Sequence, residues 1–416
     1  MNSLSKRTVT VLVTMAMALV AVLLVAGPSV AAKRAPASTV TIWTDADRKA
    51  AVDRIASAWG TARGVNVVVV QKEFGKIRDD LKTVQADTAP DVIVGAHDWT
   101  GDLAASGLVL PLNPRRTVKA KFPQYALNAF SYGTAVKKLY GAPVVIENIG
   151  LVVNTRLAKV PTSFAQLQAS ALAFKKKKAG NIAIAVQQGA AGDAYHMYPF
   201  FSGLCGYVFG TNRAGNLDPS DIGLNNPVFL KNAARIDNWN KLGLVNAKVD
   251  DGAASNAFLT GKAAYWLTGP WNVDRIKKAG IRFQVTQVPS INCKAVPFLG
   301  SQGFMVTKFS TAHGVESAAK DLVGDYMMSA NSQLALSAAN GRYPANIDAA
   351  KRVKDPVLAQ FGKAGTGGVP MPNIPQMGSV WSDLGAAWVK STKGSGAVRA
   401  RVSFSVAARN IANKIG

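Results

Sequence analysis

The sequence of 416 residues is too long for one hydrophobic core and predicts two domains. With 48% hydrophobic and 17% charged residues, its composition is that of an ordinary soluble globular protein, and no internal repeat or long low-complexity segment stands out. The formal charge of +24 favours anionic surroundings such as envelope polymers or lipid headgroups, but the basic residues are scattered, which argues against a nucleic-acid partner.

The N-terminus has the pattern of an export signal. Lys6 and Arg7 precede an uncharged apolar run at 8–27, and small residues at 30–32 offer a cleavage site. We expect residues 1–32 to be a signal peptide, and the mature chain, with a charge of +22, to be exported to the periplasm or cell envelope. The run of about 20 residues is long enough to span a bilayer, so an uncleaved membrane anchor is the alternative.

Cys205 and Cys293 are the only cysteines in the sequence, and both lie in the part expected to be exported. An oxidising compartment permits a disulfide, which we hypothesise between them. No cysteine lies near the export signal, so an N-terminal lipid anchor is not expected. Two cysteines and three scattered histidines give no zinc-ligand spacing, and we expect neither a metal nor another cofactor.

Strands and helices alternate in the first part of the mature chain. Short apolar strands are predicted at 40–43, 65–70 and 91–94, with a helix after Asp45 and another at about 76–86. This alternation indicates a parallel sheet covered by helices. Ligands of such sheets gather at the carboxyl ends of the strands, where Asp47 and Asp98 are expected.

A second unit follows the strands predicted at 143–146 and 151–154, which flank Glu147. Its first helix starts at Ser163, whose spacing to Gln166 is that of a capping box. Later elements are a helix from Asn226 to Gly243, a strand at 298–306, an extended segment at 342–346 and a last helix at about 398–415.

The most distinctive string is Met-Pro-Asn-Ile-Pro-Gln-Met at 371–377. Its two prolines predict a rigid connector, and Met377, Trp381, Leu384 and Trp388 then recur at helical spacing. A rigid connector that leads into a helix can hold the ring of Trp381 over a fixed point. The alternative is that Trp381 is an ordinary core residue.

This string resembles the signature of the maltose/maltodextrin-binding proteins, the extracellular solute-binding proteins of ABC sugar importers. Four further strings are similar to the family's and follow in family order, so the resemblance covers nearly the whole mature chain. They are Thr41-Ile42-Trp43 with Asp47, Ala96-His97-Asp98, residues 143–147, and residues 258–262 followed by Gly269-Pro270-Trp271.

The resemblance implies an α/β, two-lobed periplasmic-binding-protein fold of class II, with three hinge crossings between the lobes. The N-terminal lobe would comprise residues 40–147 plus 300–342, and the C-terminal lobe 148–297 plus 345–416. Three crossings would make a hinge rather than a flexible tether, because the strands constrain one another.

The resemblance also implies binding residues. Asp47 and Arg48 match an acid–lysine pair that holds sugar hydroxyls, with Arg in place of Lys. Asp98 matches an acid of the first lobe, and Glu147 matches the carboxylate at the first crossing. For each acid taken alone, a surface or capping carboxylate is the alternative.

In the second lobe, Asp193 and Tyr195, which follow the loop at 187–192, match an acid and a stacking tyrosine. Trp271 and Trp381 match two stacking tryptophans. Such a set suits a sugar, because carboxylates and cations bind its rim of hydroxyls while aromatic rings cover its C–H faces.

Two positions depart from the family. Gly95 stands where the family has a tryptophan, and Trp99 stands where it has an arginine. The site therefore loses one ring, regains one nearby and loses a cation. This puts the particular sugar in doubt more than the class: maltose or maltodextrin leads, and trehalose or another glucoside is the alternative.

We therefore expect a monomeric, non-enzymatic sugar-binding protein that closes on its ligand and docks on ABC permease subunits. The alternatives are a glycoside hydrolase that uses two of Asp98, Glu147 and Asp193, or a sensor that presents its sugar to a membrane receptor. Serine-hydrolase, P-loop and metalloprotease signatures are absent from the sequence.

Overall fold

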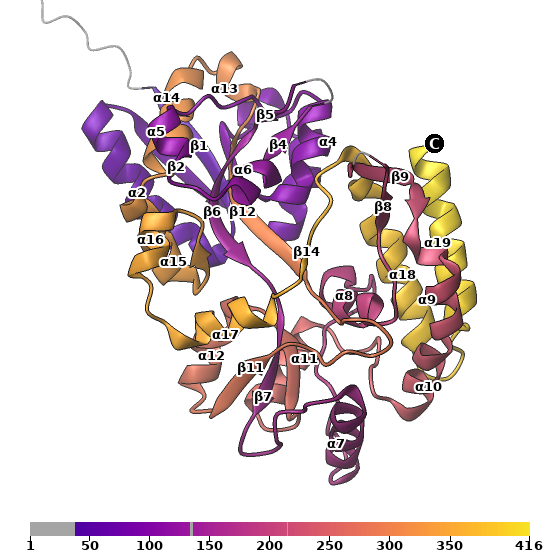
Figure 1. Ribbon diagram of the computed structural model, residues 1–416. Helices are drawn as coiled ribbons and strands as arrows, with labels where there is room; N and C mark the ends of the chain where they lie inside the picture. The colour runs from indigo at the N-terminus through magenta and orange to yellow at the C-terminus, as the bar shows by residue number, and fades with distance from the viewer. Residues whose placement is uncertain (1–37, 134–135, 214) are drawn as a thin grey trace, which may run out of the picture. The chain divides into compact units, whose positions relative to one another are not determined.

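Residues 38–133, 136–213 and 215–416 are described by the computed structural model (Figure 1). The signal or anchor expected at 1–32 lies outside these ranges. Across the described ranges, no helix is both long and apolar enough to cross a membrane.

A large sheet begins with three parallel strands. Strand β1 (Thr39–Thr44) pairs in parallel with β2 (Asn66–Gln71) and β3 (Val92–Ala96), which confirms the predicted alternation. Helix α2 (Ala46–Arg63) connects the first two strands. It starts at Asp45, whose side chain accepts a hydrogen bond from the Arg48 amide, and it ends at Gly64 with φ +67°. Only a residue that tolerates this left-handed conformation ends the helix there without strain.

Antiparallel strands extend the same sheet. The order is β13–β6–β12–β3–β1–β2, and β14 (Val369–Pro370) pairs with β12. Strand β12 (Phe298–Val306) runs antiparallel to both β3 and β6 (Gly141–Glu147), and β13 (Tyr343–Pro344) runs antiparallel to β6. Glu147 and Gln302 therefore lie on neighbouring strands.

A second sheet is small and antiparallel. Its middle strand is β7 (Gly150–Asn154), flanked by β10 (Tyr265–Thr268) and β11 (Phe283–Thr286). Only Asn148 and Ile149 separate β7 from β6, so the chain passes from the large sheet to the small one just after Glu147.

Two large hydrophobic clusters match the two sheets. One surrounds β1, β3, β6 and β12, and includes Trp59 and Phe130. The other lies beneath α7 (Phe164–Lys176), α8 (Ala194–Gly203), α10 (Ala234–Leu242), α18 (Val380–Thr392) and α19 (Ala400–Ile415). The rings of Trp388 and Phe404 meet edge to face in it, with centroids 5.3 Å apart. Trp388 therefore belongs to the core, whereas Trp381, two turns earlier in α18, is only half-buried.

Cys205 and Cys293 form a disulfide with their Cα atoms 5.3 Å apart. It ties the end of α8 to the loop before β12, where the amides of Asn292 and Cys293 both donate to the Gly203 carbonyl. The bond spans 88 residues of sequence. Closing a loop of that length restricts the unfolded chain by about 4–5 kcal/mol in the chain-entropy view.

Two helices differ from the sequence expectations. The helix expected at 76–86 is α3 (Ile77–Thr83), because Val84 is extended with ψ 143°. The helix expected from Asn226 to Gly243 is divided at Ala233 into α9 (Pro227–Asn232) and α10. After β13, helix α16 (Ile347–Arg352) packs against α15 (Ala330–Asn340) beside the large sheet.

Candidate functional site

One pocket of about 480 Å³ is lined by residues from both hydrophobic clusters and from the strands that connect the two sheets. We call it the ring-lined pocket, because it holds five aromatic rings besides His196. Its lining residues are Phe74, Gly75, Arg78, Ala96, Asp98, Trp99, Glu147, Asp193, Tyr195, His196, Trp271, Gln302, Arg342, Met371 and Trp381. Its size is that of a small-ligand site.

Seven of the nine ligand-binding residues expected from the sequence line this pocket: Asp98, Trp99, Glu147, Asp193, Tyr195, Trp271 and Trp381. They come together from the ends of β3 and β6, the start of α8, the short helix η5 (Pro270–Asn272) and the start of α18.

The structure places Asp47 and Arg48 outside the lining. The Arg48 side chain is 1% exposed and pairs with Asp45. Its guanidinium lies 5.5 Å from the ring centroid of Phe74, so it supports a wall of the pocket from behind. Asp47 is exposed, and its carboxylate lies 3.8 Å from Nη1 of Arg342.

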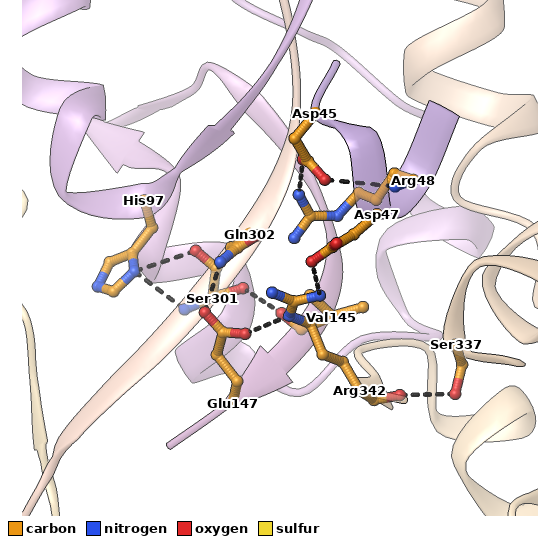
Figure 2. A network of polar contacts seen from close by, with 10 residues as sticks. All are labelled: Asp45, Asp47, Arg48, His97, Val145, Glu147, Ser301, Gln302, Ser337 and Arg342. Atoms are coloured by element: carbon orange, nitrogen blue, oxygen red, sulfur yellow. Dashed lines mark hydrogen bonds and ion pairs between the residues drawn. The ribbon is translucent and has the colours of Figure 1, made fainter. Parts of the chain in front are cut away.

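Glu147 is the centre of a buried polar network (Figure 2). Its Oε1 accepts a hydrogen bond from Gln302 Nε2, and its Oε2 accepts one from Arg342 Nε, each at 2.5 Å. Burial alone would lower the pKa of the Arg342 guanidinium, but the facing Glu147 carboxylate outweighs burial and raises it. The strands β6 and β12 and the start of β13 are thereby joined through one carboxylate.

Arg342 also reaches a ring of the pocket. Its guanidinium carbon lies 5.3 Å from the ring centroid of Trp271, which is cation–π distance. The buried ion pair with Glu147 therefore helps to fix the position of Trp271. Breaking such a pair on one side leaves a charge buried without its partner, at a cost of about 3–5 kcal/mol.

The other acid of the large sheet holds the second tryptophan. Asp98 follows β3 in the short helix η3 (His97–Trp99) and is 4% exposed. Burial raises the pKa of its carboxyl group, although His97 and the Trp381 hydrogen bond oppose that rise. Oδ2 of Asp98 accepts from Nε1 of Trp381 at 3.0 Å. This bond orients the indole that the proline-containing connector carries to the pocket.

The rings form a continuous wall. Tyr195 stacks on Phe298 with centroids 6.3 Å apart and lies 6.5 Å from Trp271. Trp381 meets Phe298 edge to face at 5.8 Å. Phe298, the first residue of β12, is fully covered and so acts as the shared support of Tyr195 and Trp381.

Three polar atoms of lining residues are buried without a partner among the described residues: the Tyr195 hydroxyl, Gln302 Oε1 and His196 Nε2. An unpaired buried polar atom costs about 1–3 kcal/mol. A ligand with hydroxyl groups can supply the missing hydrogen bonds, because a hydroxyl both donates and accepts.

Asp193 has a structural role as well. Oδ1 accepts from the His196 amide and caps α8, while Oδ2 accepts from Gln187 Nε2 and lies 2.9 Å from His196 Nδ1. Burial alone would raise the pKa of this carboxyl group, but His196 and Gln187 outweigh it and lower the pKa. The capping role considered in the sequence is therefore present at the edge of the pocket.

Sequence reasoning did not select Phe74, Arg78, His196, Gln302 or Arg342 as lining residues. Gln302 carried a usable signal, since it and Ser301 are polar residues in the middle of a buried, otherwise apolar strand. Arg342 follows the helix-ending Gly341, which has φ +65°, in the segment expected to be extended. Phe74 and Arg78 lie around η1 (Phe74–Lys76) and carried no such signal.

A second pocket of about 640 Å³ borders the same strands and shares Glu147. It is lined in part by α17 (Pro356–Ala364) and neighbouring residues, and no tryptophan lies in its lining. The ring-lined pocket is therefore the better candidate for a ligand with flat apolar faces.

The fold and the pocket define a two-lobed ligand-binding protein, and the comparisons with known proteins identify its family. Residues 51–360 match the bacterial extracellular solute-binding proteins, so the chain belongs to this family. The chain is 28% identical over 371 residues to the galactooligosaccharide-binding protein of Bacillus subtilis. The aligned region covers 84% of this chain and 83% of the relative. The chain is also 27% identical over 353 residues to a maltooligosaccharide ABC transporter solute-binding lipoprotein of Streptococcus pneumoniae, over 82% of this chain and 81% of the relative.

A solved structure is similar over nearly the whole chain. The maltotriose-binding protein of Thermus thermophilus, bound with maltotriose, superposes with a TM-score of 0.79 and 28% identity. The match covers 91% of this chain and all of the other. The expected resemblance and the two-lobed α/β fold are thereby confirmed.

Proposed function

We propose that this protein binds maltodextrin-type oligosaccharides outside the cytoplasm and delivers them to an ABC importer. The observation that carries the proposal is the ring-lined pocket, where Trp271, Trp381 and Tyr195 meet the carboxylates of Asp98 and Glu147. The maltooligosaccharide, galactooligosaccharide and maltotriose relatives support a sugar ligand.

The chemistry of the pocket suits a glucose unit. Indole and phenol rings bury the C–H faces of the sugar and orient it. Hydroxyls at its rim can bond to Arg78, to Asp98 and to the unpartnered atoms of Tyr195 and Gln302. Hydrogen bonds to charged groups contribute about 1.5–3 kcal/mol each when they are buried.

The two departures from the family compensate each other in space. A Cβ atom added at Gly95 would lie 2.8 Å from Cε3 of Trp99, so the Trp99 ring fills the space over that glycine. Trp99 also lines the pocket and lies 5.0 Å from the ring of Phe74. Arg78 supplies a cation to the same wall. These contacts support a glucoside site with altered details.

Closure of two lobes is the proposed mechanism, with an N-terminal lobe of 40–147 plus 300–342 and a C-terminal lobe of 148–297 plus 345–416. Packing of α16 against α15 favours moving the last boundary beyond Arg352. A sugar that touches rings and acids of both lobes would select the closed state, which would dock on the permease.

Glycoside hydrolysis is less well supported. A hydrolase needs one carboxyl group free to donate a proton and another free to attack or to activate water. Both oxygens of Glu147 accept bonds from Gln302 and Arg342, and both oxygens of Asp193 have partners. These engaged carboxylates favour binding without turnover.

Thermal melting over a sugar panel tests the proposal. Maltose, maltotriose, a galactooligosaccharide and trehalose would each be added to the mature chain, and the products analysed after prolonged incubation. A ligand at 100 times its Kd adds about 2.7 kcal/mol of stability. We expect maltotriose to raise the Tm most and to be recovered intact. Released glucose would favour the hydrolase. Sugar-dependent pull-down of a membrane receptor, without permease subunits, would favour the sensor.

A further inference from the structure

A second ligand site is suggested by a segment of the chain with cations and no acids. Between Asp102 and Glu147 the sequence contains six lysines and arginines and no aspartate or glutamate. They are Arg115, Arg116, Lys119, Lys121, Lys137 and Lys138. The excess of positive charge in this segment is therefore local and not only a property of the whole chain.

The structure divides these six cations into two groups. Arg115 pairs with Asp325 at 2.7 Å and Lys121 pairs with Asp348 at 2.8 Å. For the other four, namely Arg116, Lys119, Lys137 and Lys138, the described residues include no acid within ion-pair distance.

The four unpaired cations line one pocket of about 720 Å³, which we call the basic pocket. It is formed by α5 (Arg116–Lys119), α6 (Gln124–Ala129), β4 (Ser131–Tyr132) and β5 (Lys138–Leu139), in the upper part of Figure 1. Asn113, Gln124 and Ser131 add polar groups to the lining, which contains no acid.

The floor of the basic pocket is apolar. It consists of Leu112, Phe122, Leu127 and Leu139, and Leu112 bridges to Leu139 as in an antiparallel sheet. A concave surface of one charge sign with low-dielectric walls concentrates its electric field and attracts counter-ions. Lysine and arginine side chains only donate hydrogen bonds, so their partner must bring several acceptor oxygens.

We propose that the basic pocket binds an anion with several phosphate charges, separately from the sugar site. None of its lining residues lines the ring-lined pocket, so the two sites have no side chain in common. The phosphates come from either of two sources, a soluble polyvalent phosphate or the headgroups of an anionic membrane.

The experiment compares three double variants with the same loss of charge. Lys137→Gln/Lys138→Gln removes two cations from the basic pocket, whereas Lys176→Gln/Lys178→Gln removes two exposed cations at the end of α7. Arg116→Gln/Lys119→Gln repeats the pocket test from α5. Lys137, Lys138, Lys176 and Lys178 are exposed, so the two variants that replace them are expected to melt and to bind maltotriose like the parent chain.

One arm measures binding of inorganic tripolyphosphate at low salt. The other measures sedimentation with vesicles of phosphatidylglycerol, compared with phosphatidylcholine alone. We expect at least one probe to bind the parent and the α7 variant alike, and to bind both pocket variants about ten-fold more weakly. The arm that shows this order identifies the source. Equal weakening of pocket and α7 variants in both arms, or no binding of either probe, would overturn the proposal.

Discussion

The ring-lined pocket and the basic pocket differ in whether their charged side chains are paired. In the ring-lined pocket, Glu147 and Arg342 are buried and bonded to each other, and their pair holds Trp271. In the basic pocket, the four cations, three of them exposed and Lys119 half-buried, have no acid partner among the described residues. Paired charge in a low dielectric fixes geometry, whereas unpaired charge at a surface attracts mobile anions. The first arrangement suits recognition of a neutral sugar and the second suits an anion.

The largest expected effect comes from breaking the buried pair. Arg342→Met leaves Glu147 buried with Gln302 as its remaining partner, so the free energy of unfolding should fall by about 3–5 kcal/mol. Urea denaturation measures the loss. Arg115→Met is the matched control, because Arg115 pairs with Asp325 at the surface and should lose nothing measurable. Similar losses in both variants would show that burial does not distinguish the pairs.

Removal of one ring is expected to weaken sugar binding strongly. Trp381→Ala removes a half-buried indole and its hydrogen bond to Asp98, and should cost about 2–3 kcal/mol of binding free energy, or roughly 30- to 150-fold in Kd. Trp381→Phe keeps a ring but removes the bond, so its loss should be smaller. Equal losses for Ala and Phe would assign the effect to the hydrogen bond alone.

Salt should separate the two pockets. Raising the salt from about 0.05 M to 0.5 M screens exposed charges but leaves buried pairs nearly unaffected. We expect less than about a two-fold change in maltotriose affinity, while polyphosphate binding at the basic pocket should fall at least about ten-fold. Parallel titrations at four salt concentrations measure both. A steep salt dependence of sugar binding would contradict the comparison.

The smallest expected effect is a pH dependence of the free energy of unfolding. It comes from the pair of His313 with Asp91, which joins a half-buried group to a buried one. Burial would lower the pKa of His313, but hydrogen bonds to Asp91 and the Ala86 carbonyl outweigh it and raise the pKa. The pair should therefore stabilise the fold below about pH 6.5, and this contribution of less than about 1 kcal/mol should fade as the pH rises through the raised pKa. Urea melts between pH 5.5 and 8.5 should show it, and His313→Gln should flatten the curve.

The fold was largely predictable because its signals are local. Apolar runs at β1, β2 and β3, the Asp45 cap of α2 and the proline-containing connector before α18 each report their own structure. The ends of α3 and the break at Ala233 were not predictable, since neither is marked by proline or glycine.

The lining residues of the pocket were predictable where they belong to a sequence motif. They were not predictable where only the packing of the folded chain brings them together. Asp98, Glu147, Trp271 and Trp381 lie in strings that resemble a family, and all four line one pocket. Arg48 lies in such a string too, yet it pairs with Asp45 behind the wall. The partner of Glu147, Arg342, is 195 residues away in sequence, and only the folded sheet brings the two together.

The central claim is that rings and acids from both halves of the chain form one sugar site. Calorimetric titration of the mature protein with maltotriose tests it most directly. We predict one saturable site per chain with a Kd of about 1 μM, close to −8 kcal/mol, and a much weaker one in Trp381→Ala. No heat from maltotriose, or an unchanged Kd in Trp381→Ala, would contradict the claim.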